Sequence, residues 1–396
     1  SRYYQERNFT SVAGELNSRL IGCKLNNMLR FAYSYQDEPR SYEGGEFPTV
    51  DILQDGASYA SFGPDPFTAG NLREVSTYVV TDELNWNWGN HSFLAGLQYE
   101  SNDAVNGFMQ AGNGYYVFSS WSDFVNGEKP SAFGITHSNS ADLSQFQAKL
   151  KYQQYSAYVQ DQMNLTPNFK ITAGVRFELP YYPSLDNNYN AAFAKLDFGG
   201  NSYSTDQLPG KKITVSPRVG FNWDITGERK YVVRGGTGVF VGRLPFVWLV
   251  SAVSNSNVGQ TQLYYNKQAD AIKYGYKQPD FHSSVKDILT DLYGGSYTLK
   301  EPTAPSSPTI IDKDLKMPST WKTSLAFDAK LPYDIDFTLE GIYNKDFNPA
   351  IISNPGYKAD GTVQLSPNDT RTKYSQYIGG KNVYLIENGK NDAYYY

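Results

Sequence analysis

The residue types that most often carry chemistry are few in this chain of 396 residues and lie far apart. The histidines are His91, His137 and His282, and the single cysteine is Cys23. No two of them lie at metal-ligand spacing, and one cysteine cannot build a cysteine-rich zinc site. No nucleophile-elbow pattern supports a Ser-His-Asp site. We therefore expect no catalytic residue, no bound metal and no cofactor, and we predict that the chain is not an enzyme.

The glycine-rich run Gly235-Gly236-Thr237-Gly238 is the closest approach to a phosphate-binding motif. A phosphate loop needs a Lys-Ser/Thr pair and a following helix, and neither pattern is present. Glycine within a strand instead permits curvature or the close approach of a neighbouring strand.

Four charged residues share one side of the strand pattern described below: Arg176, Glu178, Arg218 and Arg234. If that side lines a water-filled interior, these are lumen-facing charges. Two interpretations remain open. Either water or another part of the protein satisfies them, or they contact a transported solute directly.

Asp82 and Asp161 occupy matching places on the opposite, apolar side, each two residues after a valine. We expect them near a membrane interface, where a charge costs little. The alternative is that they form a paired functional carboxylate.

Aromatic residues gather in the longest stretch between strands: Trp248, Tyr264, Tyr265, Tyr274 and Tyr276. Exposed aromatic rings can stack on a sugar or hold a peptide. They can equally form a small core of the loop itself, and both interpretations remain open.

The elements that must position these residues are strands, because apolar residues recur with a period of two. Residues 166–177 are the clearest case, and the turn Thr166-Pro167-Asn168 joins them to a similar run before it. The pattern predicts about ten strands in five hairpins, each strand roughly 9–12 residues long, as a tilted membrane strand requires. The apolar residues that we expect to face lipid include Phe31, Tyr33, Phe93, Leu97, Phe169, Ile171, Val175, Phe221, Trp223, Phe327, Phe337 and Leu339.

The connections between strands are very unequal in length. Hairpin turns take about two to four residues, whereas the linkers occupy residues 37–72, 101–153, 179–212, 243–319 and 344–391. Long irregular linkers argue against strands in a compact soluble domain. Short periplasmic turns and long extracellular loops are instead typical of an outer-membrane barrel. The predicted fold is therefore all-β, a transmembrane antiparallel β-barrel with long extracellular loops.

Composition agrees with this interpretation. The chain contains 33 tyrosines and has a net charge of −5, which gives no electrostatic reason to bind nucleic acid. Tyrosine suits a membrane interface, where one end of the ring is in an apolar environment and the other is wet. No apolar run is long enough for a transmembrane helix, and no signal peptide opens the chain.

With short turns in the periplasm, Ser1 would lie outside the cell, and residues 393–396 would begin another descent through the membrane. A barrel made as one chain normally starts and finishes in the periplasm. We therefore expect residues 1–396 to be part of one larger barrel domain that has further strands on both sides.

Two hairpins carry motifs that resemble those of a known family. Tyr158-Val159-Gln160-Asp161-Gln162 and Thr172-Ala173-Gly174-Val175-Arg176-Phe177-Glu178 look like the strand-turn-strand signature of TonB-dependent receptor barrels. Residues 216–224, 233–240 and 242–245 are similar to its Oar-like branch, which is common in Bacteroidota. The resemblance implies a plug domain, a TonB box and a terminal strand, none of which is visible in this sequence.

The resemblance implies a transporter of the TonB-dependent type that moves a large or scarce solute across the outer membrane. Its expected partners are outer-membrane lipid and the TonB complex through the missing N-terminal region, and the resemblance also allows a surface lipoprotein as a partner. A passive porin is the first alternative, and a surface-binding or adhesion protein with aromatic loops is the second. A soluble carbohydrate-binding β-protein is the third. Neither the solute nor the direction of its movement can be read from the residues.

Overall fold

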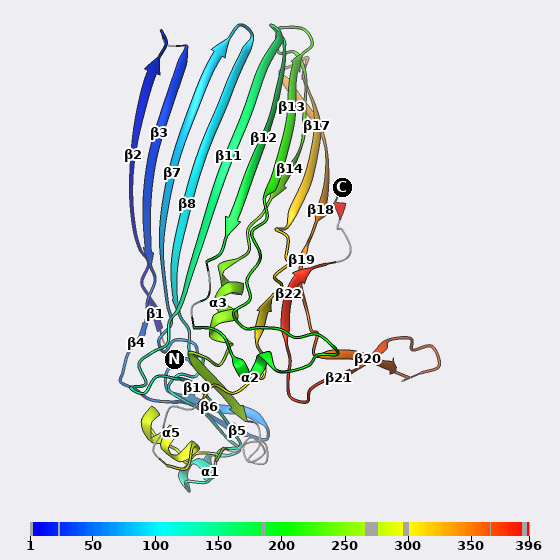
Figure 1. Cartoon of the computed structure of the whole chain (residues 1–396). Helices are drawn as coiled ribbons and strands as arrows, with labels where there is room; N and C mark the ends of the chain where they lie inside the picture. Colours follow the sequence, from blue (N-terminus) through cyan, green and yellow to red (C-terminus); the bar gives the residue numbers. More distant parts are fainter. Residues whose placement is uncertain are drawn as a thin grey trace.

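The computed structural model describes residues 3–22, 24–183, 185, 187–265, 276–295, 301–364, 366–389 and 394–395. One curved antiparallel sheet of 11 strands dominates it, with neighbours in the order β2-β3-β7-β8-β11-β12-β13-β14-β17-β18-β23 (Figure 1). The strands are β2 (Asn8–Leu20), β3 (Leu25–Asp37), β7 (Leu72–Trp88), β8 (His91–Gly107), β11 (Ala148–Thr166), β12 (Phe169–Tyr181), β13 (Thr214–Asp224), β14 (Tyr231–Val241), β17 (Ser319–Leu331), β18 (Ile335–Phe347) and β23 (Tyr394–Tyr395).

The five predicted hairpins are confirmed, and the short strand β23 pairs with β18 where the sequence predicts a further descent. Tight turns join the strands of each hairpin at one end of the sheet, which we call the turn end. Between β17 and β18 the chain reverses at Tyr333 and Asp334, both with positive φ, as a primed hairpin turn requires. The opposite end carries the long linkers and is called the loop end.

One face of the sheet is apolar and uncovered. All 12 residues predicted to face lipid lie on it, and none of them is buried. Leu97 and Leu339, for example, are 63% and 64% exposed. Soluble proteins rarely expose so large a continuous apolar surface to water. No second sheet packs on this face among the described residues, so it is available to a hydrocarbon solvent.

Two aromatic bands limit this apolar face. At the turn end, the rings of Trp86 and Trp88 are stacked with their centres 6.1 Å apart, and the ring centres of Phe169 and Trp223 are 6.2 Å apart. Towards the loop end, Tyr33 and Tyr78 lie 4.9 Å apart. Trp88 and Tyr78 are separated on β7 by about 33 Å of strand, or roughly 25 Å of height at a tilt of ~40°. The apolar band therefore has the height of a bilayer core, with aromatic girdles at both edges.

The linkers are not irregular, which corrects the expectation from sequence. Three of them contribute to a first lobe, a sheet in the order β15-β10-β9-β5-β6 with two helices. The elements are β5 (Thr49–Gln54), β6 (Ala57–Phe62), β9 (Tyr115–Phe118), α1 (Trp121–Val125), β10 (Ala132–Ser138), β15 (Gln260–Tyr265) and α5 (Val285–Leu292). The helix α5 contributes Ile288, Leu289 and Leu292 to the core of this lobe, all fully buried.

A second lobe covers the loop end beneath β12 to β18. Its sheet has the order β16-β22-β19, and Phe193, Phe198, Ile310, Val383 and Leu385 form its core. The elements are α2 (Ala191–Ala194), β16 (Thr309–Ile311), β19 (Ala350–Ser353) and β22 (Tyr384–Asn388). Two small ladders complete the loop end: β1 (Tyr3–Gln5) with β4 (Arg40–Tyr42), and β20 (Tyr357–Thr362) with β21 (Thr372–Gln376).

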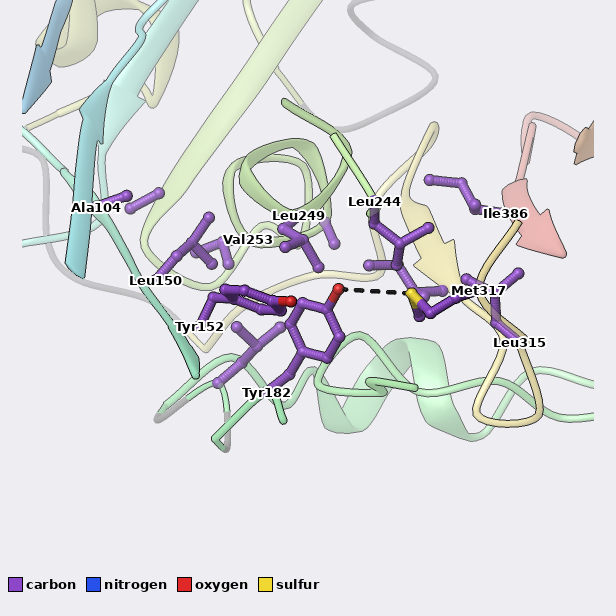
Figure 2. Packing of buried hydrophobic residues seen from close by; sticks show 14 residues of the cluster. Ala104, Leu150, Tyr152, Tyr182, Leu244, Leu249, Val253, Leu315, Met317 and Ile386 are labelled. Carbon is purple, nitrogen blue, oxygen red and sulfur yellow. Dashed lines mark hydrogen bonds between the residues drawn. The ribbon is translucent and has the colours of Figure 1, made fainter. Parts of the chain in front are cut away.

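A third core joins the large sheet to helix α3 (Phe246–Ser254). Figure 2 shows Leu249 and Val253 of this helix beside Leu150 and Tyr152 of β11. The polar side of β11 thus becomes apolar near the loop end, and α3 covers it there. This change of character along one strand face is absent from the simple alternation read in the sequence.

Candidate functional site

The polar face of the large sheet is its concave face. The chain that leaves β14 at Val241 brings Arg243 to Glu100 of β8, four places away in the sheet order. Helix α3, just after it, packs on β11 between the two. Such contacts are possible only across the hollow side of a curved sheet (Figure 1). The side chains that alternate with the apolar face therefore lie on the concave face, which we call the interior face.

Arg176 and Glu178 are brought together in this interior, as neighbours on one face of β12. The Nε atom of Arg176 donates to Glu178 Oε1 at 2.9 Å, and its Nη2 donates to Gln98 Oε1 of β8 at 2.7 Å. Gln154 of β11 donates to the same Glu178 oxygen at 2.7 Å. The charges are thus satisfied by a network across three strands, which holds them in fixed positions.

Tyr158 extends this network to β7 because β8 has a glycine between them. The Cβ of any other residue at Gly96 would lie 2.3 Å from the Tyr158 ring. The ring therefore lies across Gly96, and its hydroxyl donates to Glu83 Oε2 at 2.8 Å. The Arg176 guanidinium lies 5.1 Å from the centre of the same ring.

The ion pair between Arg243 and Glu100 fixes the first residues of the linker that contains α3. Both terminal nitrogens of Arg243 donate to the Glu100 carboxylate, at 2.6 and 2.7 Å. The guanidinium also lies 5.5 Å from the ring centre of Tyr152, and Asn102 donates to Glu100 at 2.7 Å. This arrangement joins the interior network to the helix that covers the loop end.

The other two predicted interior charges lie apart from this network. Arg218 lies 4.4 Å from the ring centre of Phe240, and Arg234 donates to Asp328 at 2.9 Å. The structure therefore places Arg176 and Glu178 together but gives Arg218 and Arg234 separate surroundings.

The predicted loop aromatics divide between core and surface. Tyr265 is buried in the first lobe and Tyr276 packs against its core, whereas Trp248 packs against the core around α3. Tyr264 is 57% exposed. Tyr274 lies outside the described residues.

Exposed Tyr264 lines a cleft of about 540 Å³ at the loop end. One wall is the first lobe, with Tyr115 of β9 and Gln262 of β15. The other wall is formed by the end of α3, with Asn255, and by the segment 305–307. This is the size of a small-molecule site with aromatic and hydrogen-bonding groups.

Asp82 and Asp161 lie on the apolar face, as the alternation predicts, and each has a separate partner. Asn27 donates to Asp82 at 2.5 Å, and Asp161 lies 2.7 Å from Nδ1 of His91 at the turn end. The two carboxylates do not form a pair with each other.

The remaining histidines belong to the first lobe. Buried His137 contacts the Tyr293 hydroxyl at 2.7 Å, and its surroundings lower its pKa, because burial disfavours the charged ring. His282 lies 3.5 Å from Asp291. The described residues contain no group of three or more His, Cys, Asp or Glu side chains that would hold a metal ion. They also include no helix of the length and hydropathy that crossing a membrane needs.

Sequence reasoning missed Arg243, Glu100, Glu83 and Gln98 as site residues. Gln98 and Glu100 alternate with Leu97 and Tyr99 on β8, so the same period-two pattern assigns them to the interior. Arg243 carries no such signal, because it follows the end of a strand.

Comparison with known proteins gives one family match. The sequence model of a family described as an outer membrane beta barrel domain matches residues 18–395. No protein in the curated set matches the chain.

Several solved structures are similar to this chain. The outer membrane transporter YddB from Escherichia coli has a TM-score of 0.55 and 13% identity, over 97% of this chain and 38% of that one. The siderophore receptor PirA from Pseudomonas aeruginosa has a TM-score of 0.44 and 10% identity, over 99% and 46% of the two chains. The copper transporter OprC has a TM-score of 0.46 and 10% identity, over 94% of this chain and 43% of that one. The likeness to YddB shows the fold alone, because the identity is 13%, and the TM-scores of PirA and OprC lie below 0.5. The chain spans less than half the length of these structures.

Proposed function

The chain belongs to the outer membrane beta barrel domain family, and from this membership we propose that it forms part of the wall of a TonB-dependent transporter. The family and the likeness to outer-membrane barrels such as YddB place it in the outer membrane. In this proposal the turn end faces the periplasm and the two lobes lie outside the cell. The transported solute is large or scarce, and transport rather than catalysis is the activity.

The observation that carries the proposal is the open arc of the large sheet. Among the described residues β2 and β23 are the two edges, and they do not pair with each other. Unpaired edges are not tolerated in hydrocarbon, so in this proposal further strands close the barrel. A barrel of more than 11 strands leaves a lumen that side chains alone do not fill. The hydrogen-bonded charges around Arg176 would line that lumen.

A plug domain and terminal strands elsewhere in the full protein complete this proposal. The plug would occupy the lumen, and its TonB box would bind the TonB complex in the periplasm. In the same proposal the two lobes offer the binding surface for a further partner, a surface lipoprotein.

A passive porin is the first competing function, and the position of α3 argues against it. The helix covers the concave face at the loop end, and the Arg243–Glu100 pair holds the chain that leads to it. A permanently open pore has no need for such a cover. The two lobes favour the second competitor, a surface-binding protein, because they provide a folded surface away from the barrel.

The test uses the full-length protein in detergent and in planar bilayers. We expect saturable binding to the purified periplasmic domain of TonB and no steady conductance. A large steady conductance without TonB binding would establish a porin. Absence of both, together with attachment of cells to a surface that depends on the lobes, would establish a binding protein instead.

A further inference from the structure

The cleft at the loop end has a chemical character that points to one class of ligand. It lies between the sheet of the first lobe, the end of α3 and the segment 305–307, with a volume of about 540 Å³. These parts come from three different linkers, so the cleft exists only because the linkers fold together.

Tyr264 forms an aromatic platform on one wall. It pairs across the strands with Gly134, and Gly134 pairs on its other side with Tyr115. A Cβ atom at Gly134 would lie 2.7 Å from the Tyr264 ring, so the ring rests on bare backbone. The ring is nevertheless 57% exposed, and it lines the cleft. Glycine at this position thus keeps a flat aromatic face in place before any ligand arrives.

Tyr115 continues the same wall with its hydroxyl already occupied. That hydroxyl donates to Asp51, and burial together with this carboxylate raises the pKa of Tyr115. The ring therefore stays neutral, and Asp51, which Ser61 also contacts, does not line the cleft.

The polar groups of the cleft are all uncharged. Besides the two tyrosines they are amides and hydroxyls, each able to donate and to accept: Gln110, Gln262, Asn255, Asn257, Ser254, Ser306 and Ser307. No Lys, Arg, Asp or Glu lines the cleft among the described residues. An anionic or cationic ligand would find no opposite charge there.

From this combination we infer that the cleft binds a neutral, polyhydroxylated ligand, a saccharide. The C–H face of a sugar ring packs on an aromatic face, while its hydroxyls exchange hydrogen bonds with amides. A peptide is the competing class, because the exposed side chain of Phe67 also lines the cleft. The amides and hydroxyls on the other walls favour the saccharide, since they match its many hydroxyl groups. The inference rests on the proposed function only in making this cleft the outward site where a solute is captured.

The experiment measures binding by isothermal titration calorimetry with the full-length protein in detergent. The probes are neutral oligosaccharides of hexose and N-acetylhexosamine units, and a mixture of unstructured peptides serves as the competing class. Tyr264→Ala removes the platform, and Gly134→Val displaces it without removing the ring. Tyr59→Ala is the matched control, because Tyr59 is 63% exposed on β6 of the same lobe but does not line the cleft. Unchanged mobility of the unheated barrel in gels confirms that each variant is folded.

We expect at least one saccharide to bind, with affinity reduced about three- to tenfold by Tyr264→Ala and by Gly134→Val. The control should stay within about twofold of the unchanged protein. Binding of peptides rather than saccharides that depends on Tyr264 would overturn the saccharide class. Absence of any saccharide binding, or binding that Tyr264→Ala leaves unchanged, would overturn the site. TonB binding and conductance do not depend on these probes, so failure here leaves the transport proposal standing.

Discussion

Removal of the Arg243 side chain should loosen helix α3 from the concave wall. Arg243 donates two hydrogen bonds to Glu100, whose side chain is only 13% exposed. A hydrogen bond to a charged group contributes about 1.5–3 kcal/mol. Half of the Arg243 side chain is exposed, so solvent screening weakens the pair. We therefore expect Arg243→Ala to reduce the free energy that holds α3 in place by about 1–2 kcal/mol. This loss corresponds to a roughly 5- to 30-fold larger open population of the segment.

Hydrogen exchange followed by mass spectrometry measures this effect on the peptide that contains α3. We expect Arg243→Ala to accelerate its exchange by the stated factor, and Arg243→Lys to restore part of the protection. Arg73→Ala is the control, because its ion pair with Glu38 at 2.9 Å does not involve α3. If the exchange rate of the α3 peptide stays within about twofold of that in the unchanged protein, the ion pair does not hold the helix in place and this reasoning is refuted.

Three further predictions test the faces of the sheet and the first lobe. Leu97→Arg should destabilise the barrel in lipid vesicles by about 2–4 kcal/mol, measured by denaturant unfolding, whereas Gln160→Arg, on the interior face of β11 and outside the Arg176 network, should cost less than about 1 kcal/mol. Gly96→Val should displace the Tyr158 ring, break its hydrogen bond to Glu83 and lower the unfolding midpoint, while Tyr158→Phe should reproduce only the loss of the hydrogen bond. Burial lowers the pKa of His137, so the unfolded lobe takes up a proton first as the pH falls. The stability of the lobe should therefore be complete above pH ~6.5 and decline below it, and His137→Gln should remove that part of the pH dependence in hydrogen exchange of β10.

The hairpins of the large sheet are predictable because their signals are local. Alternation along β11 and β12 identifies the apolar face, and the turn Pro167-Asn168 fixes where the chain reverses. The strands β13 and β14 have the predicted length, with 11 residues each, whereas the other eight hairpin strands are longer than predicted, up to 19 residues in β11. Roughly ten residues cross a bilayer, and the rest extends past the apolar band to carry the core around α3.

The folding of the linkers is not predictable by this reasoning. Strand β5 pairs in parallel with β9, and β10 pairs with β15, so the first lobe depends on contacts between distant segments. Each of these strands is short and has no turn signal that identifies its partner. The local pattern does separate Tyr264 from Tyr265 by alternation, but only the assembled lobe shows which of the two faces a cleft.

The candidate interior is predictable in part. Alternation places Arg176 and Glu178 on the polar face, but their partner Gln98 comes from a strand 78 residues earlier. The contact of Arg243 with Glu100 spans 143 residues and depends on the curvature of the sheet. Curvature is a property of the assembled strands and their glycines, and no single strand pattern contains it.

Spin labels on β8 give the most direct test of the central claim, that one face of the large sheet contacts lipid and the other lines a wet lumen. Single cysteines at positions 94, 95, 97, 98 and 99, in a chain with Cys23→Ser, are labelled and the full-length protein is placed in lipid vesicles; position 96 is left as glycine because a side chain there would collide with Tyr158. Accessibility to oxygen, which concentrates in hydrocarbon, is compared with accessibility to a water-soluble nickel complex. We predict strict alternation, with labels at 95, 97 and 99 accessible to oxygen and labels at 94 and 98 accessible to nickel or protected from both. Equal accessibility of both sets, or nickel access at Leu97, would contradict it.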